Sequence, residues 1–90
     1  MTEDIETRRK RLRYRSWHRG TKELDLLLGG FADRELGAME TAELDLYEAL
    51  LEVPEPVIYA WLSQQDTPPP NYDHAVTRRL IAFADASERP

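Results

Sequence analysis

The chain has 90 residues, 41% of them hydrophobic and 32% charged, which is typical of one small globular domain and argues against a disordered chain or a membrane span. It contains no cysteine, which excludes disulfide frameworks, thiolate nucleophiles and cysteine-ligated metal sites. The acidic N-terminus, with Glu3, Asp4 and Glu6, lacks the apolar segment of a secretory signal. We therefore expect a single domain over residues 1–90 in a cytoplasmic protein with no stable membrane association.

The formal net charge of −5 conceals an uneven distribution along the chain. Residues 1–22 hold eight basic and three acidic side chains, whereas residues 23–73 hold twelve acidic side chains and a single base, Arg34. The two regions could pair within the molecule or bind different partners. Composition alone does not decide between these alternatives.

Hydrophobic periodicity predicts helices along the chain, starting with residues 4–18. This arginine-rich segment contains good helix formers but only a thin apolar stripe, formed by Ile5, Leu12, Tyr14 and Trp17. The clearest helix comes next, because four apolar residues are spaced i, i+3, i+4 and i+7: Leu24, Leu27, Leu28 and Phe31. Gly29 and Gly30 within this stripe predict either a weak point or a close packing contact.

The third predicted helix has a possible cap at Thr41 and carries the apolar residues Leu44, Tyr47 and Leu51. The prolines of Val53-Pro54-Glu55-Pro56 must interrupt it, because a residue that precedes a proline is pushed out of the α region. Pro56 is well placed to begin the next helix.

The fourth helix carries Ile58, Trp61 and Leu62 and ends before the run of three prolines at residues 68–70. The last helix has a possible cap at Asp73 and carries Val76, Leu80 and Phe83. No segment alternates with a period of two for long enough to form a strand. The sequence therefore predicts an all-α fold, a compact bundle of about five short helices.

Residues for intrinsic chemistry are sparse. His18 and His74 lie in different helices, and neither has the acidic or histidine neighbour that a metal site needs. No phosphate-binding glycine motif occurs. We therefore expect no catalytic residues and no metal site, and consider a binding protein.

The basic run around Tyr14 and Trp17 suggests one such binding function. Arginines interleaved with aromatic rings could bind nucleic acid, although the acidic remainder of the chain would repel phosphates. An antitoxin-like regulator that binds nucleic acid or a toxin through this helix is therefore an alternative. A simple adaptor with a protein partner is another.

The junction between the first two helices suggests a protein-docking corner. Gly20 follows a helical run and could supply a left-handed helix cap, while Glu23 in the next first turn favours the helix dipole. An exposed corner of this kind would let a partner's backbone approach Gly20. Arg19 and Glu23 could then form charge-assisted hydrogen bonds to that partner.

The residues around this corner resemble the succinate dehydrogenase assembly factors, also called flavinators, whose hallmark is R-G-x-x-E. The matching positions are Tyr14, Ser16, Arg19, Gly20, Glu23 and Asp25. Agreement continues at Glu43-Leu44, Tyr47-Glu48, Pro54-Glu55-Pro56 and Trp61-Leu62, so that the resemblance covers nearly the whole chain. The chain departs from the family at residues 63–65, where relatives often carry a glycine, and at the three prolines.

This resemblance implies a five-helix assembly chaperone that is not an enzyme. We expect the chain to be a monomer, although the sequence does not show whether it dimerises. It would bind the flavoprotein subunit of succinate dehydrogenase, or of fumarate reductase, and promote covalent attachment of FAD to that subunit. The resemblance assigns partner binding to Arg19, Gly20, Glu23, Tyr14, Ser16 and Asp25. The sequence shows no FAD motif, so we expect no retained cofactor. We also expect no nucleic-acid partner.

Overall fold

The computed structural model describes residues 3–87 and is built of helices. The five α-helices are α1 (Ile5–Trp17), α2 (Lys22–Glu35), α3 (Thr41–Leu51), α4 (Glu55–Leu62) and α5 (Ala75–Ser87). Two short 3-10 helices, η1 (Leu36–Ala38) and η2 (Pro70–Tyr72), lie in the connections. Residues 3–87 contain no strand, and the predicted all-α bundle is confirmed. No helix in this part of the chain has both the length and the apolar character to cross a bilayer.

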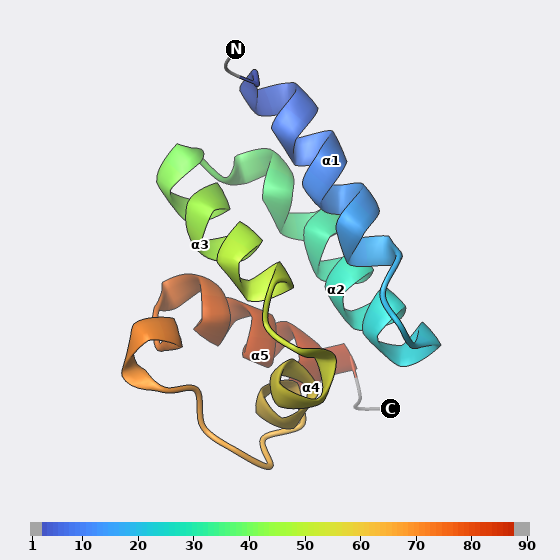
Figure 1. The fold of residues 1–90 in the computed structure, drawn as a ribbon, viewed down its shortest axis with the longest axis vertical. Coiled ribbons are helices and arrows are strands. Elements are labelled where there is room, and N and C mark those ends of the chain that lie inside the picture. Colours follow the sequence, from blue (N-terminus) through green and yellow to red (C-terminus); the bar gives the residue numbers. More distant parts are fainter. Residues whose placement is uncertain (1–2, 88–90) are drawn as a thin grey trace.

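Helices α1 and α2 pack against each other as an antiparallel pair, and α3 and α5 pack on that pair (Figure 1). The short helix α4 lies near the end of the molecule at which α1 turns into α2 (Figure 1). Side-chain caps set the first two helices: Asp4 accepts a hydrogen bond from Thr7 N at 2.8 Å, and Thr21 Oγ1 accepts one from Leu24 N at 3.2 Å.

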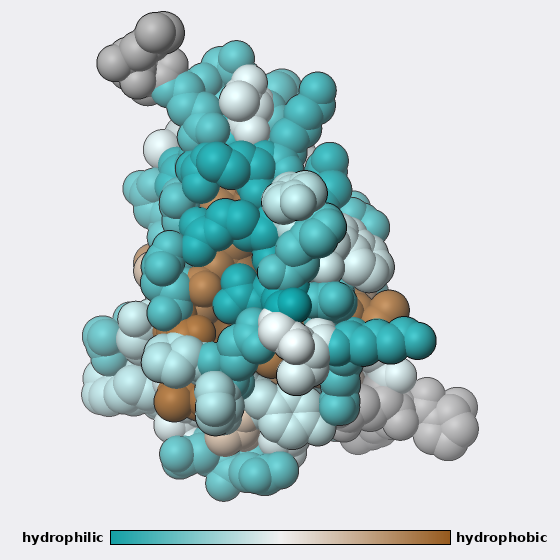
Figure 2. All heavy atoms as spheres, turned by 45° about the vertical axis from the view of Figure 1, so that its right-hand side comes forward, coloured by the Kyte–Doolittle hydropathy of each residue, from teal (hydrophilic) through white to brown (hydrophobic). Residues whose placement is uncertain are grey.

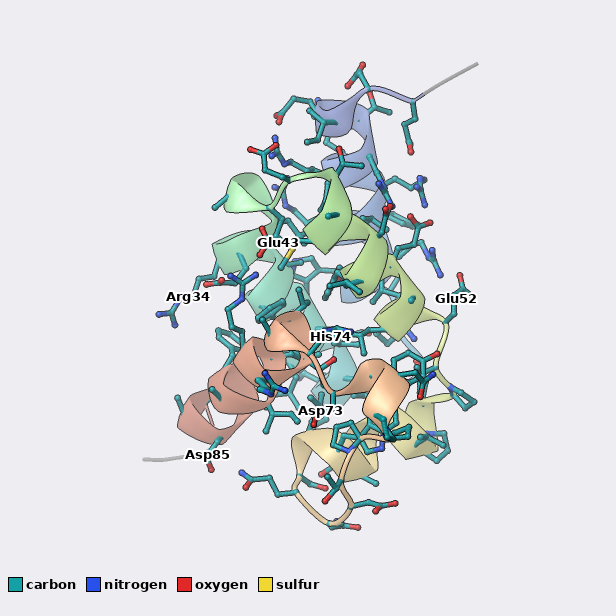
Figure 3. All side chains as sticks on the ribbon, turned by 90° about the vertical axis from the view of Figure 1, so that its left-hand side faces the viewer. Arg34, Glu43, Glu52, Asp73, His74 and Asp85 are labelled. Carbon is teal, nitrogen blue, oxygen red and sulfur yellow. The ribbon has the colours of Figure 1, made fainter. Side chains whose placement is uncertain are left out.

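Two predicted helix caps are wrong by one residue. Thr41 is already the first residue of α3, and the preceding Glu40 has the extended backbone of a cap but makes no capping hydrogen bond through its side chain. Asp73 lies two residues before the first residue of α5 (Figure 3), and its carboxylate accepts a hydrogen bond from Arg78 Nε at 3.1 Å. The next residue, His74, serves instead, because its Nδ1 accepts a hydrogen bond from Thr77 N at 3.3 Å.

The end of α4 is formed by a residue in the left-handed region. Gln64 has a φ of 62°, which glycine adopts more easily than a residue with a side chain. Its N–H donates to the carbonyl of Trp61 at 3.1 Å, and the next N–H, from Gln65, donates to Ala60 O at 2.9 Å. This pair of bonds is a Schellman motif, which satisfies the last carbonyls of the helix. The chain keeps this turn although it lacks a glycine there.

The predicted apolar stripes meet in one hydrophobic core. The largest side chains of this core are fully buried: Tyr47, Phe31, Leu12, Leu28, Leu36, Met39, Leu44, Leu50, Ile58, Leu62, Leu80 and Val76. The rings of Phe31 and Tyr47 lie 5.6 Å apart between α2 and α3. The core therefore joins all five helices.

Gly29 marks a close contact between α1 and α2. A Cβ atom built on Gly29 would overlap carbons of the Trp17 indole, so only glycine lets this ring lie across α2. The indole nitrogen donates to Asp33 Oδ1 at 3.1 Å. Of the two predicted possibilities for this glycine, the close packing contact is confirmed.

Arginines of α1 pair with carboxylates of α3, which shows that the basic and acidic regions join within the molecule. Arginines three and four residues apart lie on one helical face, where they meet an acidic face. The pairs are Arg8–Asp45 at 2.6 Å, Arg8–Glu48 at 2.9 Å, Arg11–Glu48 at 3.0 Å and Arg15–Glu52 at 2.6 Å. Figure 2, in which the side of α1 and α2 is turned forward, shows mostly hydrophilic side chains on that side of the molecule, with hydrophobic ones visible between them.

Glu48 is the centre of this charged interface and predicts a pH dependence of stability. Its hydrogen bonds with Arg11 and Arg8 hold the pKa of its carboxyl below the ordinary value of 4.5. The unfolded chain therefore binds more protons, so the contribution of Glu48 is complete above its unfolded pKa and is lost as pH falls through the lowered folded pKa. We expect Glu48→Gln to lower the free energy of unfolding at pH 7 and to flatten its fall below about pH 5, as measured by urea titrations. If the free energy of unfolding falls with pH in parallel for the two proteins, this expectation is contradicted.

We predict that Gly29→Ala destabilises the protein by about 1–3 kcal/mol, because the added methyl group must displace the Trp17 indole. A glycine-to-alanine change inside a helix ordinarily stabilises it, so the expected sign is reversed. Gly37→Ala is the control, since a Cβ there meets no atom within 4 Å. Urea unfolding of both variants measures the difference, and equal midpoints would refute the packing argument.

Candidate docking site

Arg19 lies at the corner between α1 and α2, but its side chain points inward and is only 10% exposed. Its Nε donates to Glu55 Oε2 at 3.1 Å, and its Nη2 donates to the carbonyl of Leu51 at 3.0 Å. One cation thus joins the corner to the end of α3 and the start of α4. The Arg19 guanidinium therefore binds other parts of the chain and is largely shielded from solvent.

Gly20 allows a carboxylate to approach its backbone closely. The Gly20 N–H lies 2.9 Å from each of the two Glu55 carboxylate oxygens, and a Cβ atom on Gly20 would overlap Oε1. The expected left-handed cap is wrong, since no glycine within residues 3–87 has a positive φ. Close approach, rather than backbone conformation, explains this glycine.

Asp25 closes the corner from the other side. Its Oδ1 accepts a hydrogen bond from the backbone N–H of Arg19 at 2.5 Å, and its own N–H donates to Thr21 O at 3.0 Å. The half-buried carboxylate therefore fixes the loop that leads into α2. Asp25, like Arg19 and Gly20, shapes the corner through contacts within the chain.

Glu23 is the exposed carboxylate of the corner. It accepts a hydrogen bond from the hydroxyl of Tyr59 at 2.9 Å, which links the first turn of α2 to α4. Between these helices lies a mostly apolar groove of about 390 Å³, lined by Thr21, Glu23, Leu24, Glu55, Pro56 and Tyr59. Residue-by-residue reasoning missed Glu55 and Tyr59, although Pro54-Glu55-Pro56 belonged to the segments of family resemblance.

Of the six predicted partner-binding residues, Glu23 alone lines this groove, and two of the others, Ser16 and Tyr14, lie back on α1. Ser16 is fully buried, donates to Leu12 O at 2.7 Å and hydrogen-bonds the Tyr47 hydroxyl at 2.6 Å. A partner on the surface cannot touch Ser16, so the structure gives it a supporting place in the core. Burial raises the pKa of Tyr47 to about 12, which keeps that hydroxyl protonated. Tyr14 is 64% exposed on α1, with its ring stacked on His18 at 3.8 Å.

The corner therefore has an inner and an outer part. Arg19, Gly20 and Asp25 bind other parts of the chain, whereas Glu23 and the groove face solvent. The geometry suits recognition of another protein, with one exposed carboxylate beside an apolar surface. No group of three His, Asp or Glu side chains within residues 3–87 is arranged to hold a metal ion.

Residues 10–84, which include the whole corner and Glu55, match the family described as flavinator of succinate dehydrogenase. The chain belongs to this flavinator family. The resemblance inferred from the sequence is thereby confirmed.

Flavinator-family relatives from bacteria and eukaryotes share this similarity. The chain is 35% identical over 79 residues to the FAD assembly factor SdhE of Acetobacter pasteurianus, covering 88% of this chain and 72% of that protein. It is 37% identical over 93 residues to the mitochondrial succinate dehydrogenase assembly factor 2 of Candida glabrata, covering 99% of this chain and 61% of that protein. The factor of the same name from Caenorhabditis briggsae is 35% identical over 91 residues, which cover 98% of this chain and 75% of that protein.

Coverage of these relatives varies, since the chain spans only 40% of the corresponding factor of Mycosarcoma maydis and 46% of that of Debaryomyces hansenii. All of these names describe assembly factors. The flavinator family consists of assembly factors, and the expectation that the chain is not an enzyme agrees with this.

The division into inner and outer residues predicts different effects on stability. Ser16→Ala should lower the free energy of unfolding by about 1–2 kcal/mol, because the buried Tyr47 hydroxyl loses a hydrogen-bond partner. Glu23→Ala should change it by less than about 1 kcal/mol, because this carboxylate is exposed. Urea unfolding of the two variants measures both values. A larger loss for Glu23→Ala than for Ser16→Ala would reverse the assignment.

Proposed function

We propose that this protein is an assembly chaperone that binds the flavoprotein subunit of succinate dehydrogenase, or of the similar fumarate reductase, and promotes covalent attachment of FAD to that subunit. The observation that carries the proposal is the exposed Glu23 carboxylate beside the apolar groove, within the segment that matches the flavinator family. The names of the relatives support the same client.

Glu23 and its neighbours form the surface that would contact the client. Tyr59 uses only part of the acceptor capacity of the Glu23 carboxylate, which can accept several hydrogen bonds. Leu26 lies three residues further along α2, on a neighbouring position of the helix surface, and is 54% exposed. A donor group of the client would bind Glu23 while an apolar side chain enters the groove. The exposed ring of Tyr14 on α1 would provide a separate contact.

The inner residues would act by keeping this surface in shape. Arg19, Gly20 and Asp25 hold the loop before Glu23, and Ser16 anchors the preceding turn of α1 in the core. The six residues that the sequence assigned to partner binding thus divide into contacts and supports.

A chaperone of this kind can promote flavin attachment without supplying a reacting group. The reaction requires the flavin methyl group to lie against the accepting histidine of the client, and correct orientation removes much of such a barrier. A chaperone that binds the competent conformation of the client more tightly than the others raises the population of that conformation. In this proposal FAD stays with the client, and the chain retains no cofactor.

The nucleic-acid alternative gains no support from the charge arrangement. Arg8, Arg11 and Arg15 would have to bind phosphates, but all three already pair with carboxylates of α3. Phosphates would compete with these partners and meet the same negative charge.

We predict that Glu23→Ala lowers covalent flavin in the client by roughly tenfold or more, because small losses of alignment strongly slow reactions that depend on orientation. The measurement is in-gel flavin fluorescence of the client subunit from cells that contain each variant in place of the wild-type protein. Glu40→Ala is the matched control, because Glu40 is also exposed but precedes α3 at the far end of the molecule (Figure 1). Undiminished fluorescence with Glu23→Ala, at equal amounts of folded protein, would overturn the proposed site.

A further inference from the structure

We infer that Glu55 is a positioning residue of the docking corner, which holds Arg19 and Gly20 so that Glu23 and the groove present a fixed surface. The use of this surface rests on the proposed function. The contact itself belongs to the free protein and can be tested there.

The carboxylate of Glu55 joins two chain segments that are 35 residues apart. Oε2 accepts from Arg19 Nε at 3.1 Å, and both oxygens lie 2.9 Å from Gly20 N. Hydrogen bonds to an ionised group are stronger than neutral ones, and the 10% exposed Arg19 side chain is largely removed from water. The Arg19 side chain is less exposed than those of Arg8 and Arg11 in the pairs between α1 and α3, which are 17% and 40% exposed.

The crowding at Gly20 comes from Glu55. The three atoms nearest to a Cβ built on Gly20 all belong to the Glu55 carboxyl group: Oε1, which it would overlap, Cδ at 3.3 Å and Oε2 at 3.7 Å. Any other atom is therefore at an ordinary contact distance or beyond. Without the Glu55 carboxylate, alanine would fit at position 20.

Glu55 also controls the position of Glu23. Glu55 and Tyr59 are four residues apart on α4 and thus share one face of this helix. Glu55 binds the loop before α2, and Tyr59 binds Glu23 in the first turn of α2. Two contacts therefore fix α4 against the start of α2, and both contact residues of α4 line the groove.

A double-mutant cycle with Gly20→Ala and Glu55→Ala tests this inference. In the wild-type background, Gly20→Ala should lower client flavin by about tenfold, because the methyl group displaces the carboxylate. In the Glu55→Ala background, the same change should have an effect of less than about twofold, because the obstructing group is gone. If the fold-loss of client flavin in the double variant equals the product of the losses in the two single variants, the inference is overturned.

Glu55→Gln provides a second background, which guards against misfolding of Glu55→Ala. Glutamine fills the same space but cannot form the ion pair with Arg19. Gly20→Ala should therefore remain harmful with glutamine at this position, and an equal rescue by both backgrounds would count against the steric argument. Gly37→Ala and Glu52→Ala are matched controls. A Cβ on Gly37 meets no atom within 4 Å, and Glu52, which directly follows α3, pairs with Arg15 and not with Arg19 or Gly20.

The same cycle is measured on the purified protein without a client, as urea-unfolding midpoints and as the NMR signals of the Gly20 amide and the Arg19 Nε–H. Gly20→Ala should lower the midpoint where residue 55 is glutamate but not where it is alanine, and both signals should shift in Glu55→Ala. If client flavin does not depend on Glu23 but this coupling is found, the proposed function fails and the role of Glu55 in shaping the corner holds. If client flavin depends on Glu23 but the coupling is absent, the inference about Glu55 alone fails.

Discussion

The contact between the Glu55 carboxylate, the Arg19 guanidinium and the Gly20 backbone joins the loop between α1 and α2 to the start of α4. Arg19 also donates to Leu51, so that one largely buried cation connects the loop after α1, the end of α3 and the start of α4. A charge in such a position is costly when its partner is lost. Residues of both α2 and α4 line the groove beside Glu23, so its shape depends on how α4 lies against α2.

The charge distribution shows why a net charge does not predict a binding partner. Arginines of α1 are not an exposed basic surface, because they form the joint between α1 and α3. Another arginine of α1, Arg9, donates to the carbonyls of Leu36 and Met39 at 3.0 and 2.6 Å, and thereby supports η1. An arginine stem packs like an aliphatic chain while its head binds acceptors at the rim. Specific orientation, more than total free energy, is what these exposed pairs contribute.

Features that depend on neighbouring residues could be predicted from the sequence. The helical periodicity of α2 and the break before Pro56 act within a few residues, and the structure has both. The burial of Ser16 could not be predicted, because the arginine-rich α1 packs with few apolar side chains and its inner face has no clear stripe. The reason for Gly20 could not be predicted either, because its contact lies 35 residues away at Glu55 and a left-handed cap explained the same glycine equally well. Family resemblance located the corner but did not separate the exposed Glu23 from the residues that bind other parts of the chain.

The close packing at Gly29 also gives the molecule a spectroscopic property. Trp17 lies two residues before Arg19 with its indole held across α2, whereas the second indole, Trp61, is buried in α4 beside the ring of Tyr72 at 5.3 Å. One intrinsic fluorophore thus stands on each of the two segments that meet at the corner. The two indoles have different surroundings, since Trp17 is half-exposed and hydrogen-bonded whereas Trp61 is enclosed. Their fluorescence should therefore differ. Movement of one segment relative to the other can therefore be followed without attaching a label.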